Sequence, residues 1–228
     1  MKYIIILVLA ALLLMSCTTE PTDNEQDNKQ EFIFPLSVGN YWHYDVEVIF
    51  VSCNGDDLEC HVDQNVTFNS TTVTEEYNLL RNPAFILQNE NGQTFVNENT
   101  EAGFVQHGYL NSSGNFFEDE KLIVKSPIEV GDTWVDIEGA LGNTAYECTS
   151  VNEEVTVPAG TFTCFVFRRL DEMFTDGEFH YYYYAKDIGL VKELWHKEIH
   201  IEFDESYPIP TQYQDKLVKE LDEYIIAE

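Results

Sequence analysis

The chain has few basic residues. Its 228 residues include 12 Lys and Arg against 41 Asp and Glu, which gives a formal net charge of −29. Nucleic-acid binding needs Lys and Arg to displace phosphate counterions, so nucleic acid is excluded as a partner. The same shortage excludes a polybasic contact with anionic lipid.

Common catalytic motifs are also missing. The sequence contains no G-x-S-x-G, H-E-x-x-H or P-loop motif,. Ser is scarce and the six His are scattered, which disfavours a Ser-His-Asp site. We therefore expect no catalytic residues and no enzymatic activity.

The N-terminal apolar run is too short to span a membrane. Lys2 precedes 13 uncharged residues, Tyr3 to Met15, whereas a spanning helix needs about 20 apolar residues. A positive residue followed by a run of this length is typical of a secretory signal peptide.

The four residues Leu14-Met15-Ser16-Cys17 resemble the lipobox of bacterial lipoproteins. The resemblance implies cleavage by signal peptidase II before Cys17. It also implies a diacylglycerol on the Cys17 thiol and a fatty acyl group such as palmitate on the new amine. The remaining open alternative is an ordinary signal peptide with a chance Cys.

The segment after Cys17 contains no aliphatic or aromatic residue between Thr18 and Glu31. Such a segment buries nothing and should form a solvated tether. The expected organisation is a signal peptide (1–16), a lipid-anchored acidic tether (17–31) and one β-rich domain (32–228). We expect an envelope location at the outer membrane, on its periplasmic face or the cell surface.

Alternating polar and apolar residues dominate the body of the chain. Clear examples are 41–51, 161–170, 178–186 and 190–203, with turn sequences between such runs,. From Tyr146 onward, the pattern predicts an antiparallel meander of four strands. We expect an all-β, mainly antiparallel fold, either a sandwich or a curved half-barrel. Leu217, Leu221, Tyr224 and Ile225 predict one C-terminal helix over 215–227.

A short phrase occurs twice, 92 residues apart. Pro35-Leu-Ser-Val-Gly-Asn-Tyr-Trp42 matches Pro127-Ile-Glu-Val-Gly-Asp-Thr-Trp134 in its Pro, Val, Gly and Trp residues. The Gly-Asn and Gly-Asp pairs predict turns that deliver Trp42 and Trp134 to the core. Little else aligns, so we expect one domain with two similar strand starts.

Both phrases, together with VTVPAGTF (155–162) and YYAKDIGLVKE (183–193), resemble a group of secreted or lipid-anchored β-rich proteins, mostly from Bacteroidota. The resemblance covers residues 34–203 and implies the fold, but no chemistry. Some members of the group are similar to the half-barrels of Lol-type carriers, which hold acyl chains in a concave sheet.

Four Cys follow Cys17, and export to an oxidising compartment favours disulfides. Three pairings are possible. We favour Cys53–Cys60 with Cys148–Cys164, although the second pair requires a bulge, a wider loop or a diagonal contact. A structural zinc site is a weak alternative because the Cys spacings are too long.

No residue set predicts a metal site. His196, Glu198 and His200 alternate, but on a strand the two His lie about 13 Å apart, too far to share one ion. Acidic clusters such as 56–59 and 118–120 leave calcium open, without matching a calcium-loop motif. The run Tyr181 to Tyr184 is an ordinary strand or, alternatively, a carbohydrate platform.

Three functions remain open. The favoured one is a lipid-anchored envelope protein with a non-catalytic binding or structural role, whose partner is an unknown protein, glycan or lipid. The alternatives are a carrier of a lipid or other hydrophobic ligand, and a glycan or lipid hydrolase. An open apolar cavity would favour the carrier, and two convergent carboxylates in a cleft would favour the hydrolase.

Overall fold

A computed structural model describes residues 31, 33–54, 59–78, 83–136, 144–170, 177–197 and 211–227. These residues form twelve β-strands: β1 (Tyr41–Asn54), β2 (Glu59–Tyr77), β3 (Ala84–Asn89), β4 (Thr94–Thr100), β5 (Gly103–Leu110), β6 (Phe116–Lys125), β7 (Thr133–Asp136), β8 (Thr144–Val157), β9 (Gly160–Leu170), β10 (Phe179–Ala185), β11 (Gly189–His196) and β12 (Thr211–Ile225). The predicted all-β class is therefore confirmed. The signal peptide and nearly all of the tether lie outside this part.

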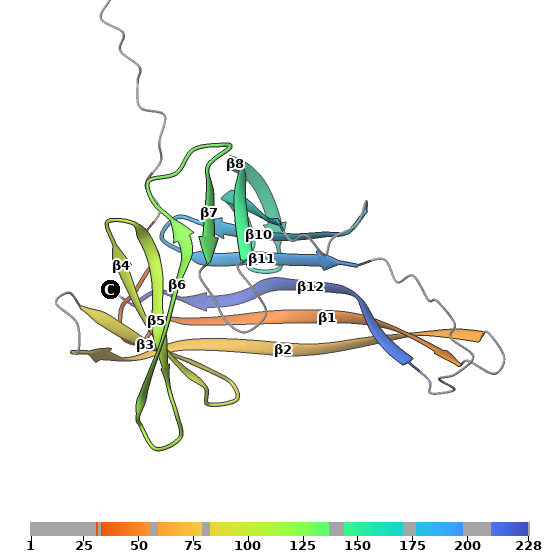
Figure 1. Ribbon diagram of the computed structural model, residues 1–228, viewed down its shortest axis with the longest axis horizontal. Coiled ribbons are helices and arrows are strands. Elements are labelled where there is room, and N and C mark those ends of the chain that lie inside the picture. The colour runs from red at the N-terminus through yellow and green to blue at the C-terminus, as the bar shows by residue number, and fades with distance from the viewer. Residues whose placement is uncertain are drawn as a thin grey trace, which may run out of the picture.

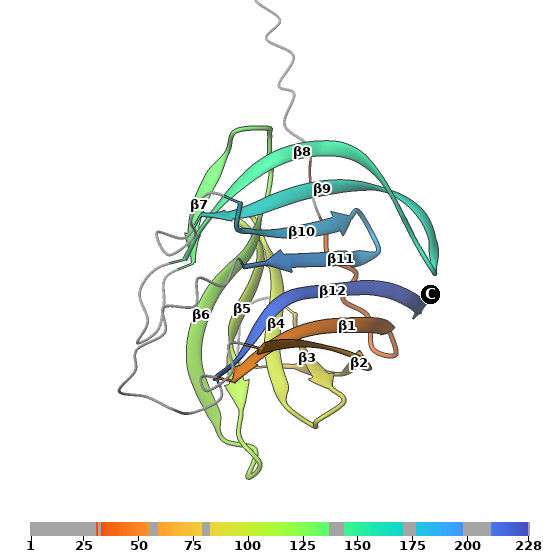
Figure 2. The ribbon, with the colours of Figure 1, turned by 90° about the vertical axis from the view of Figure 1, so that its right-hand side faces the viewer.

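The strands form one antiparallel sheet in the order β6-β5-β4-β3-β2-β1-β12-β11-β10-β9-β8-β7. Each strand pairs with its neighbour in sequence, except that β12 returns to β1 and β6 does not pair with β7. The sheet curves strongly, with β8 and β9 arching over one side (Figure 2). It is thus a nearly closed barrel with a seam between β6 and β7, and β8–β11 form the predicted four-strand meander.

The centre of the sheet is a long three-stranded ribbon of β2, β1 and β12 (Figure 1). Strand β1 pairs along its whole length with β2 on one side and with β12 on the other. Alternation along β1 places Trp42, Tyr44 and Val46 inward, where all three are buried. The core therefore lines the inner, concave face.

The predicted C-terminal helix is wrong, because 211–225 is strand β12 between β1 and β11. Its inward residues include Leu217 and Leu221, followed by Tyr224. The register with β1 shifts at Asp222, which is an extra residue in β12. This bulge lengthens one inward step from two residues to three. The resulting 4-then-3 spacing imitates the period of a helix.

The first copy of the repeated phrase forms a turn that docks on β2. Asn40 N donates to Ser37 O at 3.0 Å, and Gly39 has a φ of 97°, which a side chain would disfavour,. Gly39 N donates to Val73 O and Val73 N donates to Asn40 O, both at 2.8 Å. Strand β1 begins immediately afterwards, with Trp42 as its second residue.

The second copy has the same bonds. Asp132 N donates to Glu129 O at 3.1 Å, and Gly131 has a φ of 91°. Gly131 N donates to Cys148 O and Cys148 N donates to Asp132 O, again at 2.8 Å. The two turns therefore perform the same task at the start of β1 and of β7.

Both tryptophans that follow these turns are core residues. Trp42 is 0% and Trp134 is 6% exposed. Trp42 Nε1 donates to Ile188 O at 2.6 Å, and Trp134 Nε1 donates to Leu122 O at 3.1 Å. The second bond runs from β7 to β6, so it bridges the seam of the barrel.

None of the described segments forms a helix that could cross a membrane.

Candidate functional site

A cavity of about 210 Å³ lies on the concave face of the sheet. Nine of the twelve strands contribute to its wall, and so does the segment before β1. The lining residues are Phe34, Trp42, Tyr44, Thr71, Leu87, Asn89, Phe95, Asn97, Phe104, Gln106, Ile123, Tyr184, Leu190 and Lys219. This cavity is thus a small open space, and six of its lining side chains are aromatic.

An aromatic cluster forms one wall of the cavity. The Phe34 ring stacks on Phe104 with centroids 4.2 Å apart and lies 5.2 Å from Trp42. Asn99 fixes the backbone of Phe34, since Phe34 N donates to Asn99 Oδ1 at 3.1 Å and Asn99 Nδ2 donates to Phe34 O at 2.7 Å. The chain before β1 is therefore held in place as part of the pocket.

Gly189 allows the aromatic cluster to pack this closely. A Cβ atom at this position would lie 2.8 Å from the Phe34 ring, and the φ of Gly189 is 103°. A side chain here would both strain the backbone and displace Phe34. The glycine in the DIGLVKE phrase thus has a packing role beside the cavity.

Lys219 brings a positive charge to the same cavity. Its Nζ lies 4.4 Å from the centroid of the Tyr44 ring, a cation–π contact,. Desolvation by burial lowers the pKa of Lys219, whereas the charges of Glu193 and Glu90 act in the opposite direction. Within the described part of the chain, Lys219 makes no ion pair.

Asn97 also lines the cavity and is 3% exposed. Its Nδ2 has no hydrogen-bond partner among the described residues. A buried donor without an acceptor costs about 1–3 kcal/mol of folding free energy. An amide held in this state on a cavity wall is therefore suited to donating to a bound molecule.

Glu193 and His180 form a polar cluster next to Lys219. Glu193 lies directly opposite Lys219 in the register of β11 and β12, and its Oε1 is 2.8 Å from His180 Nε2. Tyr182 Oη lies 3.4 Å from His180 Nδ1. Burial, with a smaller effect from Glu193, raises the pKa of Tyr182 and Tyr184. Both tyrosines therefore remain protonated donors.

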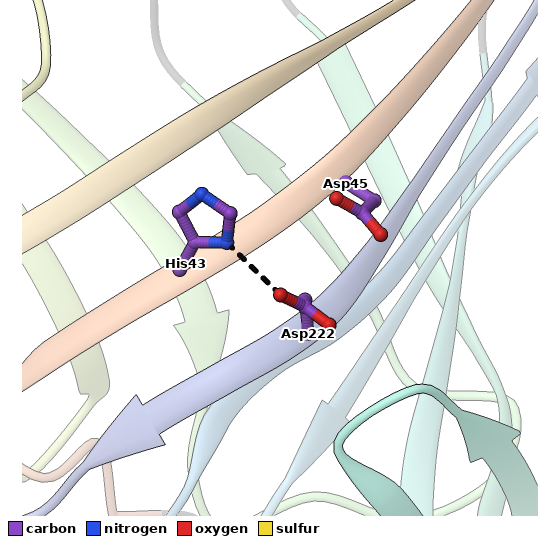
Figure 3. Close-up of side chains that lie close together, drawn as sticks. All are labelled: His43, Asp45 and Asp222. Atoms are coloured by element: carbon purple, nitrogen blue, oxygen red, sulfur yellow. Dashed lines mark ion pairs between the residues drawn. The ribbon is translucent and has the colours of Figure 1, made fainter.

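A second group of possible ligand atoms lies on β1 and β12. His43, Asp45 and Asp222 each offer an atom within 4.8 Å of the others (Figure 3). His43 Nδ1 and Asp222 Oδ2 are 3.3 Å apart, an interaction that satisfies both groups without an ion. Both carboxylates are exposed, and such surface groups are common in acidic proteins. We assign this group no ligand.

The predicted cysteine sites have different outcomes. Cys17 lies outside the described residues. Cys53 and Cys60 are direct partners in the β1–β2 register, but their side chains also lie outside the described part, so this disulfide stays a prediction. Cys148 and Cys164 are buried free thiols.

The expected Cys148–Cys164 disulfide is not formed. Cys148 lies opposite Phe167, whereas Cys164 lies opposite Glu153. The two positions are therefore three residues apart along β9, or about 10 Å at 3.3 Å per residue. A disulfide requires Cα atoms about 4.4–6.8 Å apart. A regular ladder would place Cys148 opposite Arg169, so the irregular β8–β9 register brings the two cysteines closer, but not within disulfide distance.

The other polar candidates take ordinary structural places. The His196-x-Glu198-x-His200 group lies partly outside the described residues, and the His196 ring packs 5.4 Å from Phe179. In the 118–120 cluster, Asp119 pairs with Lys121 at 2.8 Å. The tyrosine run 181–184 forms β10, where Tyr184 is buried and lines the cavity.

Sequence reasoning missed two of the polar residues that line the cavity. Asn97 and Lys219 stand at alternating inward positions of β4 and β12. An Asn inside the sequence TFVNENT and a Lys between Val218 and Glu220 look like solvent-facing residues. The only sequence evidence for them was that strand alternation places each one on the same face as an apolar residue two positions away. For Lys219, the incorrect helix assignment concealed this pattern.

No protein-family model and no curated protein sequence matches the chain. Two solved structures are similar to it. A protein designated as exported, with a YMCC-like fold, from Bacteroides fragilis is 13% identical with a TM-score of 0.46, covering 86% of this chain and 100% of that one. A protein designated as a lipoprotein from Parabacteroides distasonis is 15% identical with a TM-score of 0.33, covering 86% and 99%. Similarities this remote assign no ligand or activity to this chain.

Proposed function

We propose that this protein is a lipid-anchored envelope protein that binds a small ligand inside its barrel and does not transform it. The lipobox-like residues before Cys17 support the anchor. The observation that carries the binding role is the cavity on the concave face, whose wall holds an amide donor without a partner in the described part of the chain. A concave, mostly apolar site with a few polar groups is the usual form of a small-molecule site.

The size of the cavity favours a compact ligand over a lipid. An engineered cavity of about 150 Å³ holds one benzene molecule. By this measure, 210 Å³ accommodates one ring and a few further atoms. A long acyl chain would have to project from the mouth into water. In the ligand-carrier alternative, the ligand is therefore a small molecule with one ring.

The hydrolase alternative gains no support from this site. Glycoside hydrolysis requires two carboxyl groups about 5–10 Å apart across the scissile bond. No Asp or Glu is among the residues that line the cavity. Glu193 lies opposite the lining residue Lys219, and its carboxylate is bonded to His180.

Ligand binding by the full chain, purified from membranes in detergent, tests the proposal. Trp42 lines the cavity, so its fluorescence should report titration with toluene, benzamide and benzoate. Gln106→Trp should fill the cavity and abolish binding. Gln88→Trp, on the exposed side of β3, is the matched control and should leave binding unchanged. Binding of none of the three compounds, or equal binding to the Gln106→Trp variant, would overturn the proposal.

A further inference from the structure

Resting on the proposed function, we infer that the ligand is an anion: a single-ring carboxylic acid in its carboxylate form. Its oxygens would accept hydrogen bonds from Asn97 Nδ2 and Lys219 Nζ, and its ring would lie against the Phe34–Phe104 wall. The inference depends on three features around the same cavity: a donor and a cation that have no acceptor or ion-pair partner among the described residues, and an aromatic surface.

Asn97 supplies the first requirement. Its amide nitrogen is buried and faces no acceptor in the described structure. An amide NH₂ group only donates, so the complementary ligand atom must be an acceptor. A purely apolar ligand such as toluene would leave this donor unsatisfied, and an ammonium group offers it no acceptor.

Lys219 supplies the second requirement and determines the sign of the charge. Its ammonium group is partly desolvated above the Tyr44 ring and forms no ion pair with a described residue. Glu193 stands opposite in the register, but its carboxylate is bonded to His180. A ligand carboxylate would therefore give Lys219 a direct partner, and charge-assisted hydrogen bonds of this kind are the strong ones.

The aromatic wall supplies the third requirement. Phe34, Phe104 and Trp42 present stacked or tilted rings to a space of about 210 Å³. Aromatic pairs prefer offset or edge-to-face arrangements at centroid distances of about 4.5–7 Å. One further ring satisfies that geometry within the available volume, whereas a fused multi-ring molecule exceeds it.

The surface charge opposes an anion, so the conditions of the test matter. The net charge of −29 repels a carboxylate at long range. At about 0.15 M salt, the Debye length is about 8 Å, which screens most exposed acidic groups but not the buried contacts. Affinity for a carboxylate should therefore rise with salt up to this range.

Benzoate and benzamide form the decisive pair of probes because they have nearly the same shape and differ in charge. Titrations of the wild-type full chain by calorimetry at pH 7 and about 0.15 M salt require no variant. We expect benzoate to bind at least about tenfold more tightly, as hydrogen bonds to charged groups predict. Equal binding, or tighter binding of benzamide or toluene, would overturn the anion assignment and leave the proposed function standing.

Two variants locate the contacts. Lys219→Met keeps the stem and removes the charge, so it should remove the preference for benzoate over benzamide. Asn97→Asp keeps the shape and adds a repelling carboxylate, so it should weaken benzoate binding about tenfold or more. Lys216→Met and Asn115→Asp are the matched controls outside the cavity lining. If the cavity variants fold, as shown by their circular dichroism melts, and keep wild-type preference, the assignment of these residues is wrong.

Discussion

Trp134 bridges the junction between β6 and β7, two described strands that the β-ladder leaves unpaired. It lies on β7, and its Nε1 reaches Leu122 O on β6 at 3.1 Å. The indole packs edge-on against Phe167 at 5.1 Å and stacks on Tyr146 at 5.5 Å. Its exposure is 6%. Removing this ring should therefore cost both core packing and the contact across the seam.

The expected magnitude follows from these contacts. Truncation of a buried Trp to Ala typically costs about 3–5 kcal/mol. A domain of this size loses about 2–4 °C of Tm per kcal/mol, so Trp134→Ala should lower Tm by about 6–20 °C. Trp134→Phe keeps most of the ring but leaves Leu122 O without its donor, which should cost about 1–3 kcal/mol.

Urea unfolding followed by circular dichroism, together with thermal melts, measures both variants. The control is Tyr109→Ala, which removes an exposed aromatic ring on β5 and should change the unfolding free energy by no more than about 0.5 kcal/mol,. An unchanged Tm for Trp134→Ala would refute the core role. It would instead favour exposed tryptophans as a sugar-stacking surface.

Three further predictions concern the cysteines. Cys17→Ser should abolish fatty-acid labelling and release the protein from the membrane fraction, and wild-type protein without fatty acid on its N-terminal peptide would contradict the anchor. Non-reducing peptide mapping should show Cys53 joined to Cys60. Cys148 and Cys164 should stay unreactive toward a thiol reagent at pH 8, because burial raises their pKa to about 11 and about 12. They should react once urea unfolds the chain and lowers these pKa values, whereas fast labelling of native protein would contradict their burial.

The fold was largely predictable where it depends on residues that are close in sequence. Alternation predicted β1 and the β8–β11 meander, because each strand there pairs with its neighbour in sequence. The repeated Gly-Asn and Gly-Asp turns predicted that Trp42 and Trp134 start strands. Only the structure shows that the two turns bind the backbone of Val73 and Cys148, because a turn sequence does not determine which strand it will contact.

Bulges account for what the sequence could not predict. The extra residue Asp222 changed the inward spacing of β12 and produced a helix-like pattern. The irregular register of β8 and β9 places Cys148 opposite Phe167, where a regular ladder would place it opposite Arg169, and this shift still leaves it three residues from Cys164. A bulge changes which face a residue occupies without changing composition or propensity. Periodicity alone therefore fails at these positions, even in strands it otherwise predicts.

The cavity is the least predictable feature because no single strand contains it. Asn97 and Lys219 are 122 positions apart. Asn97 shares its face of β4 with Phe95, and Lys219 stands between the inward residues Leu217 and Leu221 of β12. They share a space only because β12 returns to pair with β1 and the sheet then curves from β1 round to β4. A polar residue in phase with the core is unfavourable for folding by itself. Once β12 is recognised as a strand, Asn97 and Lys219 are both seen to be polar residues at inward-facing positions. This is the physical reason to place the ligand there and not at the many exposed acidic groups.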